Sequence, residues 1–113
     1  MSASHSIRAA VTSWPGVTER EHRFGGCEFN YGRVELGHIH GDRLADLPFP
    51  RRVRDELVAA GRARPHHVLP DTGWVSKFIT EDGDVDDVIA LFRLNYDRVA
   101  TRRSQRTGEG RSG

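Results

Sequence analysis

The apolar side chains near the C-terminus recur with the period of an α-helix more regularly than anywhere else in the chain. They lie at Val85, Val88, Ile89, Phe92, Tyr96 and Val99. Because residues three and four apart share one face of a helix, this spacing predicts a helix over about 84–100 with one apolar stripe. A stripe of this kind must be buried against another element, and we expect it to cover one face of a sheet.

The rest of the chain supplies that sheet and two more helices. Helices are expected at 5–14 and 50–60. Strands are expected at 17–24, 27–40 and 73–79, with a hairpin turn at Gly25-Gly26 and a turn or bulge at Gly32. The segments 41–46 and 62–72 are predicted as connections. We therefore predict a small single α+β domain over 1–100, with a mainly antiparallel sheet packed by two or three helices.

Composition limits the partners of this domain. Hydrophobic residues make up 36% of the chain and charged residues 29%, and no apolar run approaches the ~20 residues that cross a bilayer. We expect no membrane partner and no secretory leader. The single cysteine, Cys27, cannot form an internal disulfide, so we expect a cytoplasmic protein.

The C-terminal segment 101–113 differs from the body. It carries four arginines and one glutamate, a net charge of +3, and it contains no apolar side chain. The body then carries 13 basic and 15 acidic side chains, a net charge of −2. We predict a disordered basic tail, and we do not expect nucleic acid as a partner.

The segment Glu35-Leu-Gly-His-Ile-His40 is the sharpest functional signal. Side chains alternate along a strand, so His38 and His40 project from the same face, together with Val34 and Leu36. Glu35 has the opposite parity and should point away unless the strand bulges. An imidazole has an unperturbed pKa of ~6.5 and is suited to proton transfer. Two hydrogen-bonded histidines at a sheet edge, with no chemistry, would explain the same pattern.

A second histidine pair, His66-His67, follows Pro65. This proline favours an extended backbone, so the adjacent imidazoles should diverge and only one of them can face a given pocket. On the following strand, Trp74 could stack on an aromatic ligand, and Lys77, the single lysine, could stabilise an anion. A metal would need a third ligand from Glu35, His66 or His67. Because the spacing matches no strong zinc pattern, we expect no metal and no other cofactor.

These motifs together resemble the luciferase-domain family of small bacterial proteins, which is related to the hispidin-type luciferases of luminous fungi. The resemblance rests on Glu35-x-x-His38-x-His40, on His66-His67 followed by Val-Leu-Pro, on Gly-Trp74-Val and on the final helix, and it spans roughly 27–99. It implies catalytic roles for His38, His40 and His67, and contacts to substrate from Glu35, His66 and Trp74.

Two functions from different classes remain open. The resemblance implies a small-molecule-binding domain with a histidine-lined pocket, and in its most specific form an oxygenase that uses O2 on an aromatic or enol substrate without a cofactor. In that form one histidine deprotonates the substrate and the others hold the resulting anion. The alternative is a noncatalytic module that contacts a protein or nucleic acid.

Overall fold

The computed structural model describes residues 2–21 and 25–112, with side chains described as far as Arg102. The three helices are α1 (Ala3–Thr12), α2 (Arg51–Ala59) and α3 (Asp82–Ser112). The six strands are β1 (Val17–Glu21), β2 (Cys27–Tyr31), β3 (Val34–His40), β4 (Leu44–Pro48), β5 (Arg64–Pro65) and β6 (Trp74–Phe78). The tight turn at Gly32-Arg33 splits the predicted 27–40 arm into β2 and β3.

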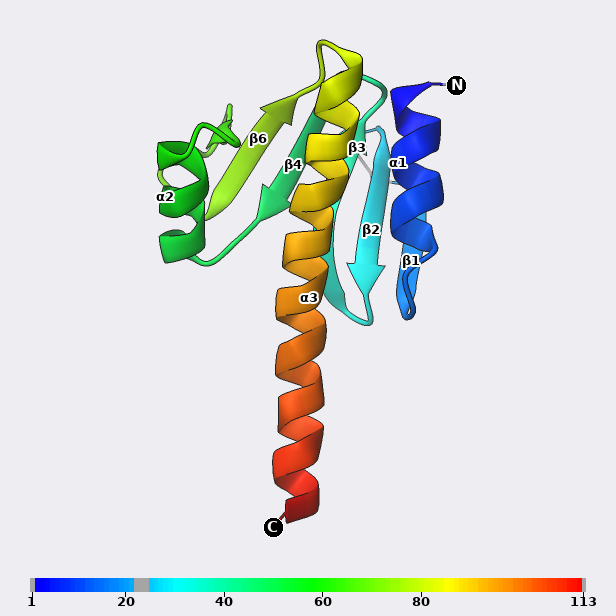
Figure 1. Cartoon of the computed structure of the whole chain (residues 1–113), viewed down its shortest axis with the longest axis vertical. Coiled ribbons are helices and arrows are strands. Elements are labelled where there is room, and N and C mark those ends of the chain that lie inside the picture. The colour runs from blue at the N-terminus through cyan, green and yellow to red at the C-terminus, as the bar shows by residue number, and fades with distance from the viewer. Residues whose placement is uncertain (1, 22–24, 113) are drawn as a thin grey trace.

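All six strands form one antiparallel sheet in the order β1-β2-β3-β4-β6-β5. Helices α1 and α3 lie side by side over one face of this sheet, whereas α2 lies at the edge near β6 (Figure 1). The predicted α+β domain is confirmed. One face of the sheet is therefore covered by helices, and the site described below lies on the other face.

The predicted stripe of α3 packs onto the sheet. Val88, Leu91, Phe92, Tyr96 and Val99 are buried in the core. Inside this apolar layer, Asn95 is fully buried, and its Nδ2 donates to the carbonyls of Leu36 (2.9 Å) and Pro48 (3.0 Å). The side chain thus ties β3 and the end of β4 to the helix.

Helix α3 runs to Ser112, past the end predicted near residue 100, and its last turns extend beyond the sheet (Figure 1). The side chains of 103–112 lie outside the described residues. The disordered basic tail over 101–113 stays a prediction.

Strand β4 lies where the sequence analysis predicted a polar connection over 41–46, and that prediction was wrong. β4 pairs with β3 on one side and β6 on the other. Its side chains alternate: Ala45 and Leu47 are buried in the core, while Asp46 between them points to the opposite face. A buried aspartate in the middle of this short strand concealed the apolar alternation.

A β-bulge in β3 corrects the predicted faces of Val34, Glu35 and Leu36, since Val34 lies toward α3 beside Arg98 and Val99. Phe29 pairs with Gly37 and Asn30 with Glu35, so Leu36 is the extra residue. Strict alternation predicted that Leu36 shares the face of the histidines. In the structure, Leu36 is instead fully buried in the core on the opposite face. The bulge brings Glu35 to the same face as His38, where regular geometry would have pointed it away.

Glycine is required at the bulge. Gly37 has φ +149°, and a Cβ added there would lie 2.7 Å from the Asp46 carbonyl oxygen and 2.8 Å from Cε1 of Phe92. Helix α3 therefore packs directly against the backbone of β3 at this point.

Candidate functional site

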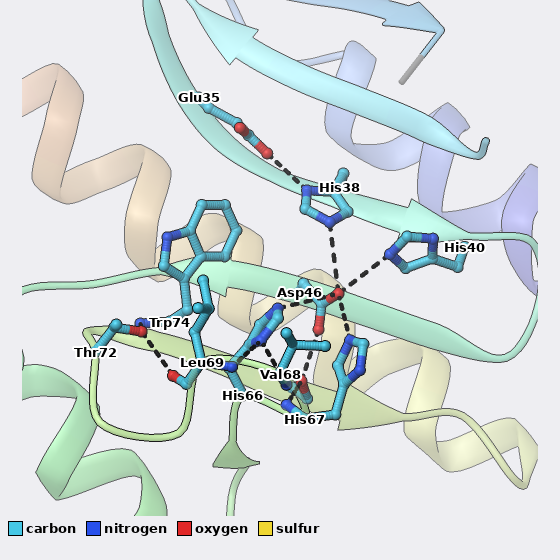
Figure 2. A network of polar contacts seen from close by, with 11 residues as sticks. Glu35, His38, His40, Asp46, His66, His67, Val68, Leu69, Thr72 and Trp74 are labelled. Atoms are coloured by element: carbon cyan, nitrogen blue, oxygen red, sulfur yellow. Dashed lines mark hydrogen bonds and ion pairs between the residues drawn. The ribbon is translucent and has the colours of Figure 1, made fainter. Parts of the chain in front are cut away.

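Asp46 is the centre of a cluster that gathers four histidines (Figure 2). Its carboxylate is 1% exposed. The Nε2 atoms of the four imidazoles lie around a single oxygen, Oδ2, at 3.4 Å for His38, 3.2 Å for His40, 3.6 Å for His66 and 3.2 Å for His67. Imidazoles from two segments far apart in the sequence thus meet at one carboxylate. The sequence analysis named the four histidines but did not identify Asp46.

Serine 76 holds the other oxygen of this carboxylate. The Ser76 hydroxyl is buried and donates to Oδ1 of Asp46 at 2.6 Å, and it accepts the backbone N–H of His67 at 3.3 Å. Burial tends to raise the pKa of Asp46, but the hydrogen bonds from His38, Ser76 and His67 outweigh it and hold the pKa below its usual range. The carboxylate is therefore ionised. Ser76 also escaped the sequence analysis, because one serine in a strand carries no local signal.

Glu35 orients His38. The carboxylate Oε2 lies 2.7 Å from Nδ1 of His38, so that His38 lies between two carboxylates. Burial alone would lower the pKa of His38, but the hydrogen bonds to Asp46 and Glu35 raise it to about 9. With its Nδ1–H given to Glu35, the Nε2 atom is the one directed at the cluster centre.

His66 is held differently from the other three. Its Nδ1 accepts the backbone N–H groups of Val68 (3.1 Å) and Leu69 (3.0 Å). This nitrogen therefore carries no proton, and the Nε2–H group faces Asp46. Burial lowers the pKa of His66, in agreement with a neutral ring. The role that these contacts define is to anchor the loop after β5.

The two adjacent histidines do not diverge, which corrects the prediction. The chain bends at His67 and Val68, so the backbone is not extended there. The rings of His66 and His67 stack with centroids 4.4 Å apart, and both Nε2 atoms reach Asp46.

Trp74 borders the cluster and Lys77 does not. The Trp74 ring lies 5.5 Å from the His38 ring and 5.9 Å from the His66 ring. Along β6, Lys77 alternates with Trp74 and Ser76, so its side chain lies on the face opposite to theirs. Its Nζ lies 3.4 Å from Oδ1 of Asp84 at the start of α3. The structure thus separates Lys77 from the predicted site residues and brings the other six together.

The cluster lies on an open face of the sheet. Helices α1 and α3 are behind the sheet in Figure 2. The side chains of His40 and His67 are 33% and 40% exposed, whereas Asp46 beneath them is sealed. The predicted histidine-lined pocket is therefore a histidine-lined face, reachable from solvent through His40 and His67.

Two sets of side chains bring potential ligand atoms within 4.8 Å of one another. The first is His38, His40 and Asp46, and the second is Asp46, His66 and His67. The sequence analysis could not find the first set, because its third member lies on the strand that was predicted as a connection.

Fold and cluster together define a small α+β domain with a histidine–aspartate site on one face of its sheet. The chain belongs to the Luciferase domain family, whose model matches residues 33–95, more than half of the chain. Searches of curated proteins and of solved structures found no match. Among the described residues, no helix combines the length and the apolar character needed to cross a membrane.

Proposed function

We propose that the histidine–aspartate cluster binds a small, acidic aromatic or enol molecule and supports its oxygenation by O2. One observation carries this proposal: imidazoles from β3 and from the loop after β5 converge on one buried carboxylate beside a tryptophan, on a face that solvent reaches. Membership of the Luciferase domain family supports it, and kinship with the fungal luciferases is part of the proposal.

The geometry suggests how the residues divide the work. His40 is partly exposed, so it can reach the acidic proton of a bound molecule and act as the base. His38 is nearly buried and fixed by Glu35, which suits it to hold the resulting anion. His67 faces the same space from the other side and orients the substrate or O2, while Trp74 offers an aromatic edge and face for packing. We place this activity in the cytoplasm, on the basis of the single cysteine.

A noncatalytic interaction module is the second candidate. Val68 and Leu69 are 67% and 46% exposed next to the cluster, and exposed apolar side chains favour a protein partner. In this case the histidines would hold the loop in place and perform no chemistry.

A binding titration separates the two candidates. The probe is 4-nitrocatechol, an acidic phenol whose absorption reports its ionisation. A Trp14→Phe background leaves Trp74 as the single tryptophan, so that quenching of its fluorescence reports binding near the cluster. We expect saturable quenching, and at least a tenfold weaker affinity in His40→Ala. O2 consumption measured with a panel of catechols and enols then tests turnover.

His5→Ala is the matched control, because His5 is exposed on α1, away from the cluster. It should bind the probe as the parent protein does. Equal binding by His40→Ala and His5→Ala, or no saturable binding at all, would refute the small-molecule proposal and favour the interaction module.

A further inference from the structure

We infer that His38, His40 and Asp46 form a binding site for one divalent first-row transition-metal ion, with His67 beside them as a third nitrogen. This inference goes beyond the proposed function and does not depend on it, because metal binding is measured without any substrate. It also replaces the expectation of a metal-free site, which rested on a spacing that matches no strong zinc pattern.

The first argument is the number of nitrogens around one oxygen. A carboxylate oxygen has about two lone-pair directions for hydrogen bonds. Four Nε2 atoms nevertheless point at Oδ2 of Asp46 within 3.2–3.6 Å. This crowding of nitrogens around one carboxylate oxygen is a geometry that a bound cation would suit, because the oxygen and the unprotonated imidazole nitrogens could coordinate it together.

The second argument is spacing. Ligand atoms about 2.0–2.2 Å from a tetrahedral metal ion lie about 3.4 Å from one another. The Nε2 atoms of His38 and His40 lie 3.4 and 3.2 Å from the Asp46 oxygen, and all three ligand atoms fall within 4.8 Å of one another. The side chains therefore need only small adjustments to coordinate one ion.

The third argument is the support of each ligand from outside. Metal-bound histidines usually donate their other ring N–H to a carboxylate or carbonyl, and metal-bound carboxylates are themselves hydrogen-bonded. The Glu35 carboxylate accepts the Nδ1–H of His38 at 2.7 Å, and the Ser76 hydroxyl donates to the second oxygen of Asp46 at 2.6 Å. Two of the three ligands thus have the partners that coordination requires.

His66 is not a metal ligand, because its hydrogen bonds fix the position of its ring proton. Its Nδ1 accepts two backbone N–H groups, so its proton is on Nε2, the atom that faces the cluster. Because Nδ1 of His66 must stay unprotonated to accept these bonds, Nε2 keeps its proton and cannot bind a metal. His38 differs, because its Nδ1 keeps a proton for Glu35 and a metal ion can displace the proton on Nε2. His66 is therefore a neighbour whose Nε2–H faces Asp46 at 3.6 Å.

The ligand set indicates the kind of metal. Two histidines and one carboxylate with open positions are the set that non-haem Fe(II) oxygenases use, and imidazole also suits zinc, nickel and copper. Exposure of His40 and His67 leaves the solvent side of the ion accessible to water, O2 or a substrate. A metal here would take part in the proposed oxygenation, in place of the cofactor-free version.

Co(II) is the probe, because its d–d absorption reports both binding and geometry. The full chain, produced without a polyhistidine tag and treated with EDTA, is titrated with Co(II). We expect one tightly bound ion per chain. His40→Ala, which changes a partly exposed side chain, should weaken binding at least tenfold, and Glu35→Gln should weaken it about 10–100-fold through the orientation of His38. Asp46→Asn should abolish the d–d bands, with circular dichroism confirming its fold.

A control variant separates a built site from surface chelation. His5→Ala removes an exposed imidazole on α1, away from the cluster, and should bind Co(II) like the parent protein. The inference is overturned if no ion binds, if His40→Ala binds normally, or if His5→Ala weakens binding as strongly as His40→Ala.

Discussion

The two faces of the sheet are built from the same strands and have opposite characters. Toward α1 and α3, β3, β4 and β6 present Ile39, Leu47 and Val75, all buried in one apolar core. Toward the other side, the same strands present His38, Asp46 and Ser76, joined by hydrogen bonds and ion pairs. Alternation along each strand thus places the residues that stabilise the fold directly beside those that form the candidate site.

This comparison teaches that the site depends on the core for its position. At the bulge that turns Glu35 toward His38, Leu36 enters the core and Gly37 lets Phe92 approach the backbone. A change on the helix side of β3 should therefore disturb the open face, whereas a change on the open face should leave the core intact. The predictions below measure how strongly the helix side of the sheet is held, and the final measurement addresses the open face.

The largest effect is expected from Gly37→Ala. Its Cβ would lie within 3 Å of the Asp46 carbonyl oxygen, Phe92 and Leu47, at a φ of +149° that favours glycine. We expect a loss of about 2–5 kcal/mol in the free energy of unfolding, measured by urea denaturation. Gly83→Ala is the control, since a Cβ at Gly83 in α3 has no neighbour within 4 Å, and it should not destabilise the protein. Equal stability of the two variants would show that the bulge is not constrained by α3.

Asn95→Leu should have the next largest effect. The substitution keeps the volume but leaves the buried carbonyls of Leu36 and Pro48 without their donor. We expect a cost of about 2–4 kcal/mol in urea denaturation. Asp97→Asn, at an exposed position two residues further along α3, should change stability by less than about 0.5 kcal/mol. A cost below about 1 kcal/mol for Asn95→Leu would mean that the buried amide does not hold β3 to the helix.

The third prediction concerns a carboxylate on the helix side. Asp84 accepts hydrogen bonds from the backbone N–H groups of Thr80 and Glu81 and from the Thr80 hydroxyl, and these lower its pKa to about 2. Because its pKa is lowered, ionised Asp84 stabilises the fold at pH values above 3.8, the ordinary pKa of an aspartate. This contribution to stability is lost as the pH falls toward 2.

NMR titration of the Asp84 carboxyl carbon measures this directly. A midpoint near 2 is expected in the wild-type protein, and Thr80→Ala, which removes one of the donors, should raise it. A midpoint near 3.8 would show that the start of α3 does not hold this carboxylate.

The smallest effect is expected at Cys27. Burial is the main cause that raises the pKa of its thiol to about 12, and a hydrogen bond to Glu19 adds to the rise. Iodoacetamide reacts with thiolates, so alkylation of the folded protein at neutral pH should be slow and should accelerate in urea. Equal rates in the two conditions would contradict a half-buried thiol that is hydrogen-bonded to Glu19.

The sequence was sufficient for those parts of the fold that depend on local periodicity. The stripe from Val85 to Val99 predicted α3 and its burial, and alternation around Trp74 placed Trp74 and Val75 on opposite faces of β6. The gathering of His38, His40, His66 and His67 could only be proposed, since nothing local states that two segments meet.

The parts that the sequence did not predict depend on contacts between distant residues. β4 was missed because Asp46 is polar, and its place in a sheet becomes clear only from its pairing with Ser76 of β6. The bulge was missed because its surroundings come from distant segments: Phe92, far away in sequence, packs against the backbone at Gly37. Lys77 was proposed as a site residue for its rarity, but the parity of β6 points it toward Asp84.

The most direct test of the account is nitrogen NMR of the histidine side chains in wild-type protein and in Asp46→Asn. If one carboxylate holds all four imidazoles, the resonances of His38, His40, His66 and His67 should change together in the variant, while those of His5 should stay the same. Changes confined to one or two of the four, or equal changes at His5, would contradict the shared site.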